Sequence, residues 1–443
     1  MNKLEFHLKN CGQIRPMHAV NNGPSKAKKT QSMSNFEDYK DAKIPYARLH
    51  DTVGWRGMGG PNLVDVSRIF TDFSKDPDDP ASYDFFYTDM YIENTLAAGT
   101  DIFYGLSETI EHGPKKYAIV PPADPVKWAK ICEHIISHYL EGWADGFHYD
   151  IKYWEIWNEP DCKDNSMWIG TKQQFFDLYE ITAKHLKSRF PQIKIGGPAI
   201  SQSAFGDLTW AEEFLEYMSM RNVPLDFFSW HIYTNTIDEF RRIAKGVEEI
   251  LVKTGYGEAE NIMNEWNYIK GWSEEFIYSV EQIIGVKGAA FIAAVMCTAQ
   301  IETSIDLAMY YDARPTVFNG MFDYYTSRPL KGYYSIKAFS ELYTLGTQVE
   351  CINSIEDVYS LGAMNNNGDC AFMITRYEDD DNVTDAKAVT VKIPELQNTI
   401  FECTIVDDIH TNKIETVKTN ENGSLELLMK PNSIFFLKKQ AAI

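Results

Sequence analysis

The chain has 443 residues, a normal apolar fraction of 44% and a formal net charge of −21. The length suits one large domain plus a smaller one, and the apolar fraction excludes global disorder. The negative charge repels phosphate backbones and anionic membranes, so we expect neither nucleic acid nor membrane as a partner. No apolar run approaches the roughly 18 residues of a membrane-spanning helix, and the first residues, MNKLEFHLKN, show no signal peptide.

The seven cysteines are scattered, odd in number and contain no CxxC pair. This usage is typical of reduced thiols, so we expect a cytoplasmic protein. His134 and His138 lie four residues apart on a predicted helix, but they lack an HExxH pattern and an apparent third ligand. We interpret both as surface residues and expect no metal and no cofactor. Whether the chain forms a homo-oligomer is left open.

In chain order, residues 13–345 alternate short apolar runs with longer helical patterns. Helices are predicted at Val126–Leu140 and Gln173–Leu186, where apolar residues recur at i, i+3 and i+4 spacing. The predicted fold class is α/β, a (β/α)8 TIM barrel over residues 1–345, because eight short strands are expected. They lie near Ile14–Val20, Pro45–His50, Thr100–Leu106, Ile151–Trp157, Lys194–Gly197, Leu225–His231, Asn261–Asn264 and Leu307–Tyr311.

From about Gly346 the pattern changes to short alternating runs, which predict a small antiparallel β-sandwich domain over residues 346–443. Asn367-Gly368 and Asn422-Gly423 fit hairpin turns, and Glu378–Asp381 is interpreted as a solvated loop tip. Residues 1–12 are candidates for pairing with this domain, since Leu4–Leu8 alternates in polarity. The strand candidates of the tail are Ala371–Thr375, Ala388–Ile393, Ser424–Met429 and Ser433–Leu437.

Two glutamates stand where predicted barrel strands end. Glu159 follows the strand in YWEIWNEPD (Tyr153–Asp161), and Glu265 ends the strand in NIMNEWNY (Asn261–Tyr268), flanked by Trp266. Functional groups of a TIM barrel lie at the carboxyl ends of its strands. Glycoside hydrolysis needs two carboxyls, one to protonate the leaving oxygen and one to attack the anomeric carbon or activate water. A helix-capping role for Glu159 is the structural alternative, and the pair is more specific than either glutamate alone.

Further polar residues are expected on the same rim. In DFFSWHIYT, residues 226–234, His231 and Tyr233 end the intervening strand, and the Tyr hydroxyl can hold a nucleophilic carboxylate ionised and oriented. In YARLHD, residues 46–51, Arg48 and His50 lie on one side of their strand. An Arg beneath two carboxylates lowers the pKa of the one it pairs with. The structural alternatives are a core histidine for His231 and a barrel salt bridge for Arg48.

These motifs resemble glycoside hydrolase family 39, the β-xylosidase and α-L-iduronidase family of a clan with catalytic glutamates on strands four and seven. The resemblance implies a retaining double displacement, in which Glu159 resembles the acid/base and Glu265 the nucleophile. It also implies that Asn158 binds the sugar 2-hydroxyl, and that His50, His231 and Tyr233 surround the glycone. An all-β domain beside the barrel fits the family as well. The motifs, in order over about residues 40–340, are YARLHD, WEIWNEPD, KIGGPAI (Lys194–Ile200), DFFSWHIYT, the Glu265 strand and FNGMFD (Phe318–Asp323).

The sequence departs from the family pattern around the pocket wall. Tyr311, in MYYDAR, stands where family β-xylosidases tend to have Trp, and Asn319-Gly320-Met321 replaces a His-Gly-Gly segment. The loop after strand two, which begins at Gly54, is unusually long. Trp266, Tyr311 and Asn319 are nevertheless included among the expected substrate contacts.

We therefore predict a retaining exo-glycosidase acting on a glycoside or oligosaccharide, with β-xylosidase the leading activity. β-Glucosidase, β-galactosidase and α-L-arabinosidase are the alternatives within the class. A non-catalytic carbohydrate-binding barrel is disfavoured because it would need no acid/base pair. A barrel lyase or isomerase is disfavoured because no metal cluster or Schiff-base lysine is visible in the sequence. Retention predicts that the two carboxyl groups lie about 5–5.5 Å apart.

Overall fold

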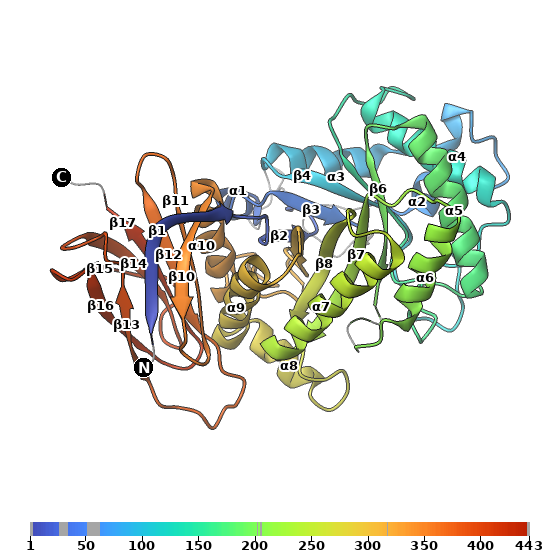
Figure 1. Ribbon diagram of the computed structural model, residues 1–443. Coiled ribbons are helices and arrows are strands. Elements are labelled where there is room, and N and C mark those ends of the chain that lie inside the picture. The colour runs from blue at the N-terminus through green and yellow to red at the C-terminus, as the bar shows by residue number, and fades with distance from the viewer. Residues whose placement is uncertain are drawn as a thin grey trace.

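The computed structural model describes residues 3–25, 34–50, 63–201, 203, 206–316 and 318–440. The first part of the long loop that begins at Gly54 lies outside these residues. Eight parallel strands close a barrel, so the predicted fold class is confirmed and each expected strand is present (Figure 1). In barrel order they are β2 (Ala19–Asn21), β3 (Tyr46–Leu49), β4 (Asp101–Leu106), β5 (Tyr153–Ile156), β6 (Lys194–Ile200), β7 (Phe227–Thr234), β8 (Glu260–Tyr268) and β9 (Leu307–Tyr310).

Side chains that point into the barrel stack in layers because successive residues of a strand face opposite sides. The lowest layer is apolar and contains Phe103, Phe227 and Met309. A polar layer lies above it, built from residues that hydrogen bond to one another across the barrel: Asn21, Arg48, Glu155, Ser229 and Asn264. The candidate site residues lie at the carboxyl ends of the strands, above this polar layer.

Helices cover the outside of the barrel. Asp124 caps the first turn of α4 (Pro125–Leu140), and Thr171 forms a capping box with Gln174 at the start of α5 (Lys172–Arg189), so both predicted helices begin at an N-terminal capping residue. His134 and His138 are buried, which corrects their interpretation as surface residues; the His138 ring stacks on Phe85. The helices are α1 (Phe36–Asp41), α2 (Val66–Ile69), η1 (Pro80–Ser82), α3 (Phe86–Ala97), α4 (Pro125–Leu140), α5 (Lys172–Arg189), α6 (Thr209–Met220), α7 (Ile237–Thr254), α8 (Phe276–Ile283), α9 (Val286–Glu302) and α10 (Lys331–Leu345).

The rest of the chain forms a nine-stranded sheet beside the barrel (Figure 1). β1 (Leu4–Gln13), from the start of the chain, lies inside this sheet between β10 (Thr347–Asn353) and β13 (Lys387–Lys392). Asn367-Gly368 joins the paired strands β11 (Val358–Met364) and β12 (Cys370–Arg376). Asn422-Gly423 does not make the predicted hairpin, because β16 (Ser424–Met429) pairs with β13. The other strands are β10 (Thr347–Asn353), β11 (Val358–Met364), β12 (Cys370–Arg376), β13 (Lys387–Lys392), β14 (Ile400–Val406), β15 (Lys413–Lys418), β16 (Ser424–Met429) and β17 (Ser433–Lys439).

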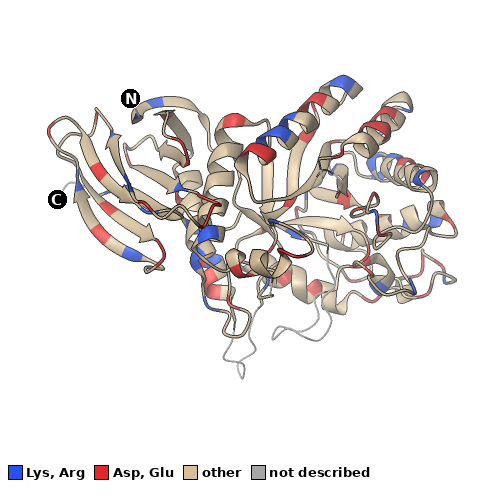
Figure 2. Ribbon diagram, turned by 90° about the horizontal axis from the view of Figure 1, so that it is seen from below, with Lys and Arg blue, Asp and Glu red and all other residues tan. Residues whose placement is uncertain are grey.

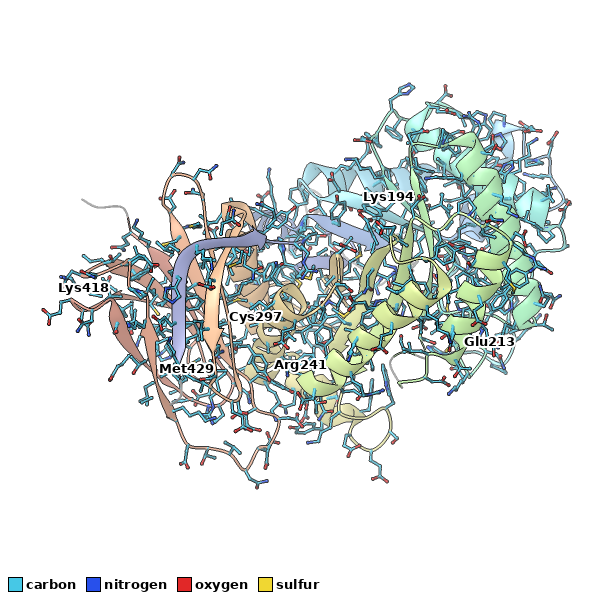
Figure 3. All side chains as sticks on the ribbon, viewed as in Figure 1. Lys194, Glu213, Arg241, Cys297, Lys418 and Met429 are labelled. Carbon is cyan, nitrogen blue, oxygen red and sulfur yellow. The ribbon has the colours of Figure 1, made fainter. Side chains whose placement is uncertain are left out.

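The sheet packs against the barrel through α9 and α10. Nearly every residue of α9 is buried, since this helix lies between barrel and sheet, and Figure 3 labels its Cys297 at the junction. Among the described residues no single helix could span a membrane; α8 and α9 pass that test only as a pair bent by 78°. Acidic and basic residues are interspersed along the helices and strands (Figure 2). Asp379 and Asp381 bind barrel residues, which corrects the interpretation of Glu378–Asp381 as a solvated loop tip.

Candidate active site

Asn158 and Glu159 lie at the end of β5, where the chain leaves its regular strand conformation. Trp157 and Glu159 both have left-handed backbone torsions, with φ of 71° and 47°. Non-glycine residues rarely adopt such torsions, and they cluster at functional sites. The Trp157 ring packs outward against Trp128, while Asn158 and Glu159 reach inward to Arg48 and His231. The irregular backbone thus places two consecutive side chains over the barrel mouth.

Glu265 reaches the same place through an irregularity in β8. His231 of β7 pairs with Glu265, whereas Trp230 pairs with Met263, so β8 carries one extra residue between these positions. Asn264 and Glu265 therefore both contact inward residues, Glu155 and Arg48 respectively. A bulge of this kind re-aims a side chain. Without it, strand alternation would turn Glu265 toward the helices.

The two glutamate carboxyls face each other across the His231 ring. His231 Nδ1 lies 2.7 Å from Glu159 Oε1, and its Nε2 lies 3.8 Å from Glu265 Oε2. One oxygen of each carboxyl and a His231 nitrogen all lie within 4.8 Å of one another. Nearest oxygens this close are compatible with the carboxyl separation of about 5–5.5 Å in retaining enzymes, in which one carboxyl attacks directly. By spacing alone, the same three residues could also hold a metal ion.

The Tyr233 hydroxyl and the Arg48 guanidinium hold Glu265 in place. Tyr233 donates to Glu265 Oε1, and Arg48 Nη1 donates to Oε2 at 3.2 Å. His50 Nε2 lies 3.6 Å from Oε2. Burial raises the pKa of Tyr233, so its hydroxyl keeps its proton and remains a donor. Each oxygen of Glu265 therefore has an assigned neighbour, which fixes the plane of the carboxyl.

Glu155 balances the charge of Arg48 beneath the site. Both side chains are fully buried, and Glu155 Oε2 accepts from Arg48 Nε at 2.7 Å. Ser229 and Asn264 each donate to the other Glu155 oxygen at 2.6 Å. A buried guanidinium needs such a partner, since an unpaired buried charge costs several kcal/mol. Arg48 is therefore shared between Glu155 below and Glu265 above.

Burial raises the pKa of Glu265 to about 7. His231, Arg48 and the Tyr233 hydroxyl all lower this pKa, while the neighbouring Glu159 raises it. The balance leaves Glu265 partly protonated near neutral pH, so its ionisation depends on the groups that hold it.

Asn158 and Tyr311 also lie at this site. Asn158 Oδ1 accepts from Arg48 Nη2 at 2.6 Å, so the amide turns its N–H donors away from Arg48. The Tyr311 ring, partly exposed, lies 6.2 Å from His50 and 5.9 Å from Phe318. Phe318 and the half-exposed Trp272 stack at 6.1 Å and both contact the Tyr233 ring. These aromatic rings form a wall beside Glu265 that strand patterns alone do not predict.

Two expected substrate contacts do not join the site. Trp266 is buried, and its ring packs on Tyr310 and Phe291 between strand and helix, because it follows Glu265 and so faces the opposite side. Asn319 is also fully buried. Its amide donates to Thr316 and accepts from the backbone of Met321 and Phe322, so its polar atoms order its own loop.

Glu155 is a charged residue beneath the site that sequence reasoning missed. It lies inside YWEIW, four residues before Glu159 on a strand predicted to be buried. A carboxylate at a buried position must find a partner, and that rule was the available signal. Arg48 and Glu265 were assigned to the same site without it.

The profile of glycosyl hydrolases family 39 matches residues 32–285, more than half of the chain. The chain belongs to glycosyl hydrolase family 39. This confirms the family resemblance of the barrel motifs. The match ends before α9, so it contains Arg48, Glu159 and Glu265 but not Tyr311 and not the sheet domain.

Relatives of this family 39 chain include two bacterial enzymes. A beta-xylosidase of Geobacillus stearothermophilus is 31% identical over 198 residues, covering 42% of this chain and 38% of the relative. A beta-xylosidase of Caldicellulosiruptor saccharolyticus is 29% identical over 223 residues, covering 48% and 41%. The chain thus matches about two fifths of the length of these relatives.

Solved structures agree with the fold over the whole chain. A glucosidase from Croceicoccus marinus superimposes with a TM-score of 0.80 at 20% identity, covering 100% of both chains. A monomeric beta-xylosidase from Caulobacter crescentus CB15 gives a TM-score of 0.72 at 13% identity, again covering 100% of both. The barrel and the sheet domain therefore occur together in other proteins.

Proposed function

We propose that this chain is a retaining exo-glycosidase, with β-xylosidase the leading activity. The observation that carries the proposal is the pair formed by Glu159 and Glu265, whose nearest oxygens are within 4.8 Å and whose surroundings differ. Glu265 is held by cationic and hydroxyl donors, as an attacking carboxylate requires, whereas Glu159 contacts His231. Family membership and the two beta-xylosidase relatives support the reaction and the sugar.

In the first step, the Glu159 carboxyl donates its proton to the glycosidic oxygen as the bond from that oxygen to C1 breaks. Ionised Glu265 attacks C1 from the opposite face and forms a glycosyl ester. Asn158 presents an N–H donor beside the site and can bind the sugar 2-hydroxyl, an interaction that strengthens in the transition state. Tyr233 and Arg48 stabilise Glu265 before attack.

In the second step, Glu159 accepts a proton from water, which attacks C1 and releases Glu265. The sugar leaves with its original anomeric configuration, because two inversions have occurred. His231 lies within hydrogen-bonding distance of Glu159, so it can stabilise that carboxyl when its proton is lost and regained. Each atom and proton of the cycle is thereby accounted for by these residues and one water molecule.

The roles of the two glutamates can be separated by substitution. Glu265→Ala leaves no nucleophile, so turnover should fall by about 10⁴-fold or more on every substrate. Glu159→Ala should depend on the leaving group, losing about 10²–10⁴-fold on unactivated glycosides but much less in the first step of activated aryl glycosides. Azide, which needs no base, should then restore turnover of the Glu159 variant and give a glycosyl azide of retained configuration. Rescue of the Glu265 variant to a retained product would reverse the two roles.

The sugar is tested with a panel of nitrophenyl glycosides: β-xyloside, β-glucoside, β-galactoside and α-L-arabinoside. We expect the highest kcat/KM on the β-xyloside. NMR of the first product formed should show the anomer of the substrate. Binding of these compounds without any release of nitrophenol would instead favour a non-catalytic binding barrel.

A further inference from the structure

The sheet domain sends one acidic loop, residues 377–381, back to the rim of the barrel. Asp379 Oδ1 accepts from the Tyr268 hydroxyl and Oδ2 from Asn235 Nδ2, both at 2.7 Å. Asn235 directly follows β7, and Tyr268 is the last residue of β8. The Tyr377 hydroxyl in turn donates to the Asn235 backbone carbonyl. The loop therefore holds the ends of two neighbouring barrel strands.

The same two strands also carry Tyr233 and Glu265, near the ends that the loop holds. The side chains of Tyr233 and Glu265 hydrogen bond to each other. In the parallel pairing of β7 with β8, Thr234 lies opposite Tyr268 and His231 opposite Glu265. We call the hydrogen bonds from Tyr268 and Asn235 to Asp379 the Asp379 clamp. This clamp fixes the spacing of the two strand ends next to the Tyr233–Glu265 hydrogen bond. Burial raises the pKa of Tyr268, so its hydroxyl stays protonated and remains a donor to Asp379.

Two lysines anchor the acidic loop. Lys287, buried at the start of α9, donates to the Asp379 carbonyl and to Asp381, each at 2.7 Å. Lys270, in the segment after β8, lies 3.3 Å from Asp379 Oδ2. These contacts keep the loop in place although its charge would favour exposure to water. A solvated loop tip would need neither a buried lysine nor two neutral donors from the barrel.

We propose that Asp379 is a positioning residue of the active site, through which the sheet domain sets the geometry of the Tyr233–Glu265 pair. The inference rests on the proposed function, since it assigns Glu265 as the nucleophile. Asp379 acts only through the strand ends and touches no reacting group. The sheet domain is, on this proposal, a working part of the site and not an independent appendage.

Four variants distinguish the effect of losing the hydrogen bonds of the clamp from the effects of losing the Asp379 charge and of losing folded protein. Asp379→Ala removes the clamp and the charge, whereas Asp379→Asn removes only the charge, because the Asn235 amide can turn to offer its oxygen to the new N–H. Tyr268→Phe removes one arm of the clamp and keeps the ring packing. Asp380→Ala is the control, since Asp380 is exposed and its side chain accepts hydrogen bonds from Asn382, just after the loop.

We expect Asp379→Ala to lower kcat/KM by about 10–100-fold, mostly in kcat, because misplacements near 1 Å cost that much. Asp379→Asn should retain most of the activity, Tyr268→Phe should lose about 2–5-fold, and Asp380→Ala should match the wild type. In the double variant, Tyr268→Phe should lower kcat/KM little further than Asp379→Ala alone, since both substitutions remove the same hydrogen bond. Thermal unfolding of each variant shows whether enough folded protein remains for comparison.

Titration of Glu265 gives a second measurement that needs no turnover. The groups facing it are Arg48, His50, Glu159, His231 and Tyr233, and Tyr311 acts on Tyr233. Loss of the Asp379 charge alone would leave Lys270 and Lys287 less neutralised and would lower the Glu265 pKa. A loosened Tyr233 hydrogen bond would raise it.

In Asp379→Ala, ¹³C NMR of labelled glutamate, assigned with Glu265→Gln, should therefore show a higher Glu265 pKa than in Asp379→Asn. Equal pKa values and equal kcat/KM in these two variants, even with a lower melting temperature, would overturn the inference. A wild type that hydrolyses no glycoside would refute the proposed function instead, and the titration would still decide whether the clamp acts on Glu265.

Discussion

At the scale of single residues, the ionisation of Glu265 sets the pH range in which the site can work. Its pKa is raised to about 7 by burial, and only the ionised form can attack. We expect kcat/KM to increase with pH on the acidic side, with a midpoint near 7 in the free enzyme. A pH profile of kcat/KM on an activated aryl glycoside measures this midpoint. An acidic midpoint below pH 5 would mean that Arg48, His231 and Tyr233 outweigh burial.

The same carboxylate should cost stability. The pKa of Glu265 is above its ordinary value of 4.5, so its contribution to stability is fully present below about pH 4.5 and is lost as pH rises through about 7. Glu265→Gln removes the charge and keeps the shape. At pH 8 the free energy of unfolding of this variant, measured with denaturant, should exceed that of the wild type by about 1–3 kcal/mol. Near pH 4 the two should not differ. Glu249→Gln, on an exposed side chain, is the control; lower stability of Glu265→Gln than of the wild type at pH 8 would contradict the argument.

At the scale of elements, sequence periodicity predicted the eight strands and two of the helices but not the local irregularities that aim the glutamates. Regular alternation explains why Arg48 and His50 share a side, and why His231 and Tyr233 do. It cannot show that β8 carries an extra residue before Glu265, because an extra residue leaves no mark in an apolar run. Trp266 was expected in the pocket because it flanks Glu265, but its ring faces Phe291.

Gly105 shows how closely two strands approach beside the site. A Cβ on this residue of β4 would lie 2.9 Å from His50 Cβ and 3.2 Å from the Leu49 carbonyl oxygen. Gly105→Ala should push His50 from its place 3.6 Å from Glu265, lowering kcat about 10-fold. Crowding of this kind should also cost about 1–3 kcal/mol of stability. Gly113→Ala, where the nearest atom is 3.7 Å away, should change neither quantity. Unchanged kinetics for Gly105→Ala would mean that His50 is not needed there.

At the scale of the whole molecule, the two ends of the chain meet in one sheet. β1 pairs with β10 on one side and β13 on the other, so it connects the β13–β16 pair to the remaining strands. Alternating polarity in Leu4–Leu8 predicted that the start of the chain pairs with the second domain, and β1 does so. Its exact place between β10 and β13 depends on pairing over more than 330 residues of sequence, which local patterns do not encode. The domains are thus joined by the chain at both ends as well as by the Asp379 loop.

Substitution of Phe6 tests whether the site in the barrel depends on the folding of the sheet domain. Its fully buried ring lies 4.7 Å from Phe372 in the core of the sheet domain. Phe6→Ala should lower the free energy of unfolding by about 3–5 kcal/mol, whereas Leu428→Ala, on a side chain 68% exposed, should stay within about 0.5 kcal/mol. Every tryptophan lies before residue 273, so fluorescence reports on the barrel, while alkylation of the buried thiols Cys370 and Cys403, read by mass spectrometry, reports on the sheet.

If the sheet holds β7 and β8 through Asp379, heating Phe6→Ala should abolish activity at the temperature at which Cys370 and Cys403 become reactive. Tryptophan fluorescence should change at that temperature or above it, because the barrel keeps its own core after the clamp is lost. Activity that persisted after both thiols had reacted would show that the barrel site works without the sheet. It would also count against Asp379 as a positioning residue, since the loop cannot hold the strand ends once its domain has unfolded.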